Sequence, residues 1–206
     1  MKKAFTLAEI MIVLTVIGIL TAILMPIAFH SAPDENVMKF KKANSTIGTV
    51  VRELVSSDMY FQNGDLGKTA AGANPSATYL CKSMGDVMTY KTLNCTSYSK
   101  GSAYLTTNVK TSVDTECAKV TAAQVQIITP DGVSYFEVAS STPFSNSNLR
   151  TKNTDGFYNS YKPICIDVDG VGVGEAPFGY GLRLDGKMIS GARADEWTAK
   201  SVQRGS

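Results

Sequence analysis

The sequence predicts an α+β protein in which a long N-terminal helix packs on a C-terminal antiparallel β-sheet. Three observations support this prediction. Residues 10–29 carry no charged side chain, apolar residues recur at helical spacing over residues 34–57, and short β-rich runs flank turn signals in the second half of the chain. A helix followed by a series of strands is the order expected of the α+β class. The length of 206 residues suffices for one domain and one additional element.

The first predicted element, residues 5–30, is the transmembrane half of the long helix. As a helix, the uncharged stretch of residues 10–29 would rise about 30 Å, the thickness of the hydrocarbon core of a bilayer. Lys2 and Lys3 precede it, which favours an N-terminus in the cytoplasm and a C-terminal domain outside. The predicted topology is a single pass through the cytoplasmic (inner) membrane.

Three interpretations of this segment compete. A cleaved signal peptide would have a shorter apolar stretch and an A-x-A-like site after it, and neither is found here. A plain membrane anchor accounts for the length but not for Glu9, because a carboxylate at the edge of the hydrocarbon costs on the order of a few kcal/mol unless it has a partner. In the third interpretation, cleavage of the chain creates a new amino terminus that serves as this partner.

The third interpretation rests on residues 3–10, Lys-Ala-Phe-Thr-Leu-Ala-Glu-Ile. They resemble the processing site of the type IV pilin family, which includes type IV pilins, type II secretion pseudopilins and competence pseudopilins. The family pattern is a short basic leader, a small residue, a cut before Phe, then Thr, and Glu at the fifth position of the mature chain. Phe5, Thr6 and Glu9 match this pattern. Ala4 departs from it, because the residue before the cut is usually glycine, and alanine should fit a tight peptidase subsite less well.

The resemblance implies that residues 1–4 are a leader peptide removed by prepilin peptidase and that Phe5 becomes the N-methylated terminus. Glu9 lies four residues along the helix, on the same face as that terminus. Its carboxylate can pair with the amine of its own chain or with that of a neighbouring subunit, and the second pairing would set the register of a filament. The other implied partners are further pilin or pseudopilin subunits and an assembly platform protein.

The implied function is that of a structural subunit, processed in the inner membrane and then assembled into an extracellular or periplasmic filament. Major pilin, secretion pseudopilin and competence pseudopilin stay open as roles. The alternative is a membrane-anchored extracytoplasmic binding protein that does not polymerise, which leaves Glu9 unexplained.

A net charge of +2 argues against nucleic acid as a partner, because phosphate binding needs clustered Lys or Arg. No enzyme is predicted, because the single histidine, His30, lies at the membrane exit and no nucleotide-binding glycine motif occurs.

Residues 31–60 are predicted to continue the helix as an amphipathic stem, so that one helix covers residues 5–57. Apolar residues mark one face of this stem by spacings of three, four and seven: Val37, Phe40, Ile47, Val50, Val51, Leu54 and Val55. We expect this face to be buried against a sheet. Pro26 is expected to bend the helix, because proline lacks an amide donor and clashes with the preceding turn. It also lies where many members of the family carry a helix-bending proline.

Residues 61–206 are predicted to form the soluble periplasmic or extracellular domain. A short helix or irregular segment is expected near residues 80–90, and two β-rich runs around a Pro-Asp-Gly turn predict a hairpin over residues 125–138. Further strands are predicted at residues 164–168, 180–184 and 187–190. Residues 96–118 show no clear pattern, and the tail, residues 191–206, is interpreted as a solvated terminus.

Four cysteines, Cys81, Cys95, Cys117 and Cys165, predict disulfides because their number is even and the domain is exported. Three pairings are open. The short loop favours Cys81 with Cys95, which leaves Cys117 with Cys165. The alternative is four buried free thiols, and zinc ligation is disfavoured because the sequence has no CxxC.

Residues 164–190 resemble the C-terminal strand–loop–strand of major pseudopilins and related pilins, some of which bind calcium there. The resemblance implies that Asp167, Asp169 and Glu175 supply carboxylate oxygens for Ca²⁺. Their spacing does not fit an EF-hand, and Asp and Gly are also ordinary turn residues. A plain solvated loop without a cofactor therefore stays open.

Overall fold

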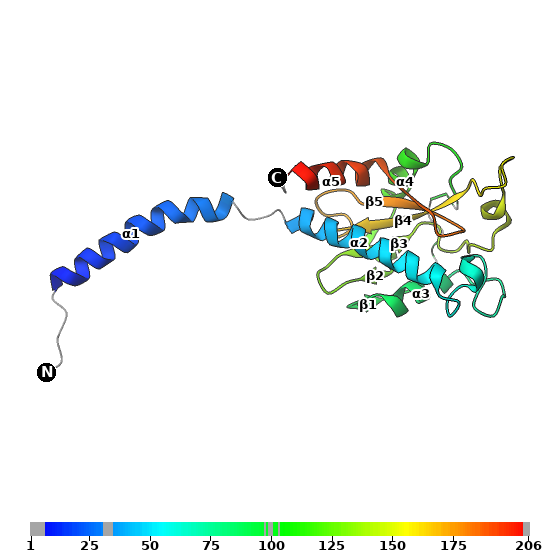
Figure 1. The fold of residues 1–206 in the computed structure, drawn as a ribbon, viewed down its shortest axis with the longest axis horizontal. Helices are drawn as coiled ribbons and strands as arrows, with labels where there is room; N and C mark the ends of the chain where they lie inside the picture. Colours follow the sequence, from blue (N-terminus) through cyan, green and yellow to red (C-terminus); the bar gives the residue numbers. More distant parts are fainter. Residues whose placement is uncertain (1–6, 31–34, 97, 99–100, 103, 204–206) are drawn as a thin grey trace. The chain divides into compact units, whose positions relative to one another are not determined.

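The computed structural model describes residues 7–30, 35–96, 98, 101–102 and 104–203, without the side chains of residues 23–30 and 203. The chain divides into two compact units, Met1–Asp34 and Glu35–Ser206. The helix α1 (Leu7–His30) belongs to the first unit, and the second unit holds the other helices and the sheet (Figure 1). The predicted α+β class is confirmed.

The helix α2 (Glu35–Ser56) is the central helix of the second unit. Its buried residues lie on one face: Val37, Phe40, Ala43, Ile47, Val50, Val51 and Leu54. Val55 is half-buried and packs against the same cluster. The predicted apolar face is therefore confirmed. The predicted continuity with α1 depends on residues 31–34, which lie outside the described residues.

A six-stranded antiparallel sheet packs against α2, and each strand pairs with the next one along the chain. The strands are β1 (Thr92–Leu93), β2 (Ile127–Ile128), β3 (Ser134–Glu137), β4 (Tyr161–Asp167), β5 (Phe178–Arg183) and β6 (Met188–Ser190). The predicted hairpin is confirmed as β2 and β3, where Ile128 pairs with Ser134. In its turn the amide of Gly132 donates to the carbonyl of Thr129, and Gly132 has a φ of 85°, which glycine adopts without strain. The predicted final pair of strands is confirmed as β5 and β6.

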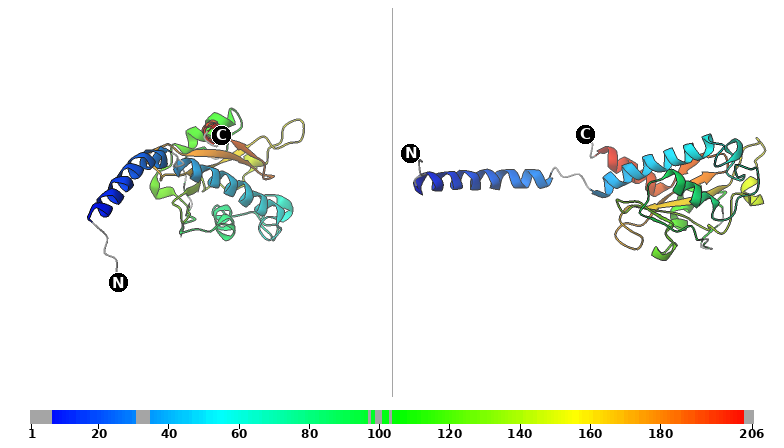
Figure 2. Two further views of the ribbon diagram at one scale, coloured as in Figure 1. Left: turned by 60° about the vertical axis from the view of Figure 1, so that its left-hand side comes forward. Right: turned by 90° about the horizontal axis from the view of Figure 1, so that it is seen from below.

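Successive side chains of a strand point to opposite faces of the sheet, and both faces are covered, one by α2 and the other by α4. On β4, Ile164 and Ile166 belong to the large cluster with α2, whereas Cys165 belongs to a second cluster with α4 (Val109–Cys117). Gly179 of β5 allows α4 to approach closely, since a Cβ there would lie 2.5 Å from Sγ of Cys117. Figure 2 shows this domain from two further directions.

The short helix expected near residues 80–90 is α3 (Tyr79–Val87). Residues 96–118, which show no clear pattern in the sequence, contain α4. Three short 3₁₀ turns complete the domain: η1 (Gln62–Gly64), η2 (Ala122–Gln124) and η3 (Ser147–Arg150).

The interpretation of residues 191–206 as a solvated terminus is wrong. This segment contains α5 (Ala192–Gln203), which packs against α2 and β5. The indole of Trp197 is buried and stacks on Phe40, with ring centroids 5.6 Å apart. At the start of α5, Oδ2 of Asp114 accepts a hydrogen bond from the amide of Arg193 at 2.8 Å. Aromatic burial and this capping contact from α4 hold the C-terminal helix on the domain.

Candidate functional site

The residues of the predicted cleavage and N-methylation site, Ala4 and Phe5, lie outside the described residues, so their roles stay predictions. The described chain begins at Leu7, where α1 starts, and Glu9 lies in the first turn with an exposed side chain. A carboxylate in the first turn of a helix interacts favourably with the helix dipole, by about 0.3–1 kcal/mol. The local structure therefore accommodates an acid at Glu9 in the isolated chain.

After Glu9, the described part of α1 presents apolar side chains on all sides. Every side chain described in this helix, over residues 7–22, is exposed, including Leu7 at 81% and Ile12 at 64%. The hydroxyl of Thr15 donates to the carbonyl of Met11 at 2.6 Å, and that of Thr21 donates to the carbonyl four residues before it. These bonds satisfy the hydroxyl donors within the helix. An exposed apolar surface of this extent is typical of a site of interaction with protein or membrane.

Two predictions concern residues 5–30, the membrane span and the bend at Pro26. Among the described residues, no helix combines the length and the apolar character needed to cross a membrane. Pro26 lies inside α1, which continues to His30. Its side chain is outside the described residues, and the predicted bend stays a prediction.

Both disulfides of the structure have the predicted pairing. Cys81 in α3 is bonded to Cys95, with Cα atoms 5.6 Å apart, and Cys117 at the end of α4 is bonded to Cys165 in β4, with Cα atoms 5.5 Å apart. The closed loops of 14 and 48 residues correspond to a stabilisation of about 3 and about 4 kcal/mol on the chain-entropy model. The second disulfide fixes α4 on the face of the sheet opposite to α2.

The acidic loop after β4 brings together two of its three predicted ligands. Asp167 is 1% exposed, and its Oδ1 accepts hydrogen bonds from the amides of Asp169 at 3.2 Å and Gly170 at 2.9 Å. Oδ2 of Asp169 accepts from the amide of Glu175 at 2.9 Å. The other carboxylate oxygen of each aspartate is buried and has no hydrogen-bond partner among the described residues. Burial raises the pKa of Asp167 to about 6, and the adjacent Asp169 side chain contributes to the rise.

The loop does not assemble the predicted set of three carboxylates. Glu175 takes part through its backbone, and its side chain is exposed. In the described part of the chain, no group of three or more His, Cys, Asp or Glu side chains is placed to hold a metal ion. The orphan oxygens of Asp167 and Asp169 nevertheless fit a hard cation, because such an ion takes carboxylate oxygens as ligands.

A buried ion pair, which the sequence does not predict, joins β3 and β4. The side chains of Glu137 and Lys162 are each 1% exposed, and Oε2 of Glu137 lies 2.5 Å from Nζ of Lys162. Nζ also donates to the carbonyl of Thr142 at 2.8 Å. The sequence alone does not indicate this pair, because Glu137 and Lys162 are far apart along the chain. They meet only because of the register between β3 and β4. The pair is part of the domain core, next to Phe144.

Comparison with known proteins identifies the N-terminal segment. Residues 1–25 match the family model of the prokaryotic N-terminal methylation motif. This motif is the prepilin-type cleavage signal of type IV pilins and pseudopilins, whose family is structural rather than enzymatic. No curated protein and no solved structure matches the chain. The motif therefore supports a pilin-like or pseudopilin-type protein.

Proposed function

We propose, from the N-terminal methylation motif, that this chain is a structural subunit of a type IV pilus or a type II secretion-like filament. The observation that carries the proposal is the motif at residues 1–25 together with residues 7–22 of α1, which expose apolar side chains in every direction. In the cytoplasmic membrane, lipid would surround α1. In the filament, the α1 helices of neighbouring subunits would replace the lipid and bury the same surface.

Cleavage after Ala4 would turn the backbone nitrogen of Phe5 into a cationic amine, and N-methylation would leave it chargeable. Glu9, one helical turn away, supplies the opposite charge. An amine and a carboxylate of adjacent subunits, enclosed by apolar side chains, would each be left unpaired if the subunits slipped along one another. Such a pair acts on register more than on stability, because desolvation offsets much of its attraction. The disulfide-bonded domain would then lie outside the bundle of helices.

Processing is tested by analysing the N-terminus of the chain in fibres sheared from cells. We expect a sequence that starts at N-methylated Phe5. Ala4→Leu should leave an unprocessed precursor on a blot, because a bulky side chain does not fit a subsite made for glycine or alanine. A mature protein that begins at Met1 or beyond residue 30 would contradict the proposal, and absence of fibres would favour the tethered binding protein.

The role of the carboxylate is tested by comparing Glu9→Gln with Glu35→Gln. Both residues are exposed glutamates in the first turn of a helix, so that the two variants remove the same charge from similar local positions. We expect Glu9→Gln to be cleaved and inserted in the membrane but absent from sheared fibres. Glu35→Gln should assemble at the level of the wild type. Equal assembly of the two variants would reject the pairing between subunits.

For the acidic loop we propose that Asp167 and Asp169 hold Ca²⁺, with backbone carbonyls and water completing its coordination. The support is the pair of buried carboxylate oxygens without hydrogen-bond partners among the described residues. Calcium at 100 times its Kd would add about 2.7 kcal/mol to the free energy of unfolding. Thermal melting with calcium and with chelator measures this gain, which Asp169→Asn should abolish and Glu175→Gln should preserve. Identical melting of the wild type in both conditions would rule the site out.

A further inference from the structure

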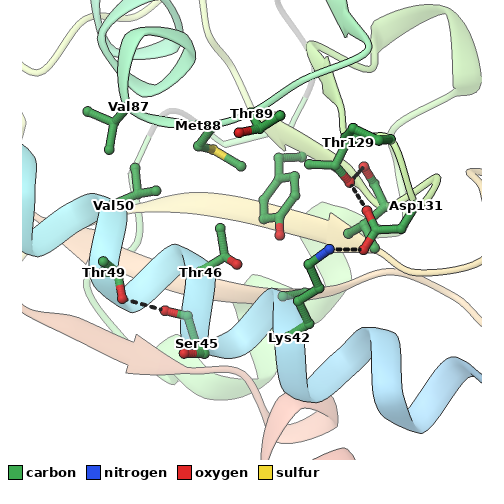
Figure 3. A pocket seen from close by; sticks show the side chains of 14 residues that line it. Lys42, Ser45, Thr46, Thr49, Val50, Val87, Met88, Thr89, Thr129 and Asp131 are labelled. Carbon is green, nitrogen blue, oxygen red and sulfur yellow. Dashed lines mark hydrogen bonds and ion pairs between the residues drawn. The ribbon is translucent and has the colours of Figure 1, made fainter.

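A groove of about 890 Å³ opens on the second unit (Figure 3). Its walls come from residues 42–50 of α2, residues 87–89 at the end of α3, and residues 129–135 of the β2–β3 hairpin. Val133 and Tyr135 in the hairpin wall are 1% and 2% exposed. The volume lies within the range of about 300–1,000 Å³ that is typical of sites for small molecules.

Small polar side chains on α2 keep this groove open. Ser45, Thr46 and Thr49 line it from α2. Thr46 is half-buried at the edge of the buried face, whereas Ser45 and Thr49 are exposed, and the hydroxyl of Thr49 donates to the carbonyl of Ser45 at 3.0 Å. Ser and Thr are poorer helix formers than Leu, Lys or Glu by a few tenths of a kcal/mol each. A longer side chain at these positions would favour the helix and fill the space. Residues that disfavour the local secondary structure, such as Ser and Thr in a helix, are expected at functional sites.

The side chains of the groove are sorted by polarity along its length. In Figure 3, Val50, Val87 and Met88 gather at one end, and Lys42 and Asp131 lie at the other, with Ser45 and Thr46 of α2 between them. A ligand that fills the groove therefore meets an apolar surface at one end and hydrogen-bonding groups along the rest.

The charges of the groove cancel. Nζ of Lys42 lies 2.7 Å from Oδ2 of Asp131, and Oδ1 of the same carboxylate accepts a hydrogen bond from the hydroxyl of Thr129 at 2.5 Å. An anionic or cationic ligand would have to compete with this pair. A wholly apolar ligand would strip water from the hydroxyls without replacing its hydrogen bonds, which is unfavourable. The groove thus selects a neutral ligand that carries both hydroxyl groups and apolar patches.

We propose that this groove binds a neutral oligosaccharide. Sugar hydroxyls both donate and accept hydrogen bonds, as do the hydroxyls of Ser45, Thr46 and Thr89 that line the groove. The C–H faces of sugar rings can cover the apolar end at Val87, which is half-buried above the buried side chains of Val50 and Met88, while the hydroxyls keep their hydrogen bonds. An N-acetyl group places a methyl on that end, so N-acetylated sugars bind more tightly than their unsubstituted counterparts.

The test uses the full chain, purified in lauryldimethylamine oxide, because detergents with sugar headgroups would compete for the groove. The probes are an array of neutral, N-acetylated and acidic oligosaccharides, followed by calorimetric titration of those that bind. We expect binding of neutral oligosaccharides, strongest for N-acetylated ones such as chitotriose. Ser45→Leu should weaken this binding by about tenfold or more, because the larger side chain fills part of the groove and removes one hydroxyl contact.

Ser56→Leu is the matched control, since it makes the same change on the same helix at an exposed position about 16 Å along the axis from Ser45. It should bind as the wild type does. Thr89→Leu narrows the groove from the opposite wall and should lose binding even if Ser45→Leu perturbs α2. Absence of binding to any neutral oligosaccharide, binding of acidic ones only, or unchanged binding in both groove variants would overturn the proposal. None of these results depends on filament assembly, because the groove lies entirely within the second unit.

Discussion

The helix α1 and the domain that begins at Glu35 place their apolar side chains in opposite ways. The large apolar side chains described in α1 are exposed by 50% to 81%, whereas Phe40, Ile47 and Leu54 of α2 are exposed by 1% or less. Apolar surface in water is unfavourable by roughly 25 cal/mol per Å². The domain therefore carries its stabilising core within itself, while the described apolar side chains of α1 have no such cover from the described chain.

The comparison predicts that truncating an apolar side chain destabilises the chain in the domain and not in α1. Phe40 packs edge-on to Phe178, with ring centroids 4.9 Å apart, and against Trp197. Phe40→Ala should lower the free energy of unfolding by about 3–5 kcal/mol. Leu14→Ala, at a side chain that is 64% exposed, should leave it unchanged within about 0.5 kcal/mol. Urea titration followed by fluorescence of Trp197, the single tryptophan, reports on the domain alone. Equal losses in the two variants would show that α1 shares the core of the domain.

The next largest effect is expected from the disulfide between Cys81 and Cys95. Replacing both by serine releases a loop of 14 residues and should lower the free energy of unfolding of the domain by about 3 kcal/mol. The helix content of α1 in micelles should not change, because both cysteines lie in the second unit. Circular dichroism and the Trp197 transition, measured on the same sample, separate the two responses.

The contrast between α1 and α2 could be predicted from the sequence because it is periodic. The apolar spacing from Val37 to Val55 identifies the buried face of α2, and the absence of charge over residues 10–29 identifies α1 as apolar all round. The hairpin of β2 and β3 was equally local, since its turn residues lie between the strands. The orphan carboxylates of Asp167 and Asp169 also lie near each other in sequence.

The elements that could not be predicted depend on contacts between distant segments. Among its described side chains, α5 buries a single large apolar one, that of Trp197, in a mostly polar tail, and its first turn is capped by Asp114 from α4. The groove is formed by three segments that are separate in the sequence, and each of its hydroxyl residues alone looks like an ordinary surface position. The burial of Glu137 and Lys162 follows from strand register.

A smaller effect on stability is expected from the buried side chain of Asp167, because its ionisation opposes folding. Because the pKa of Asp167 in the folded chain is about 6 and the ordinary value is 3.8, the unfolded chain loses this proton first as the pH rises. The free energy of unfolding should therefore fall between about pH 4 and pH 6, by on the order of 2 kcal/mol. The difference between wild type and Asp167→Asn isolates this contribution from other acids. A difference that does not vary with pH would contradict the raised pKa.

The smallest effect is expected at the first turn of α2, where the domain begins. Nζ of Lys39 lies 2.8 Å from Oε1 of Glu35, four residues away, and the Glu35 side chain is 79% exposed. Such an exposed pair contributes about 0.3–0.5 kcal/mol, and salt screens it. Glu35→Gln should thus lower the free energy of unfolding by less than about 1 kcal/mol, and the loss should shrink in 1 M salt. Glu196→Gln in α5 removes a pair of the same spacing, to Lys200 at 3.0 Å, and serves as its control. A much larger loss of stability in Glu35→Gln than in Glu196→Gln would mean that the charge of Glu35 holds the start of α2 in place. Equal small losses would instead show that the start of α2 is held by the burial of its apolar face.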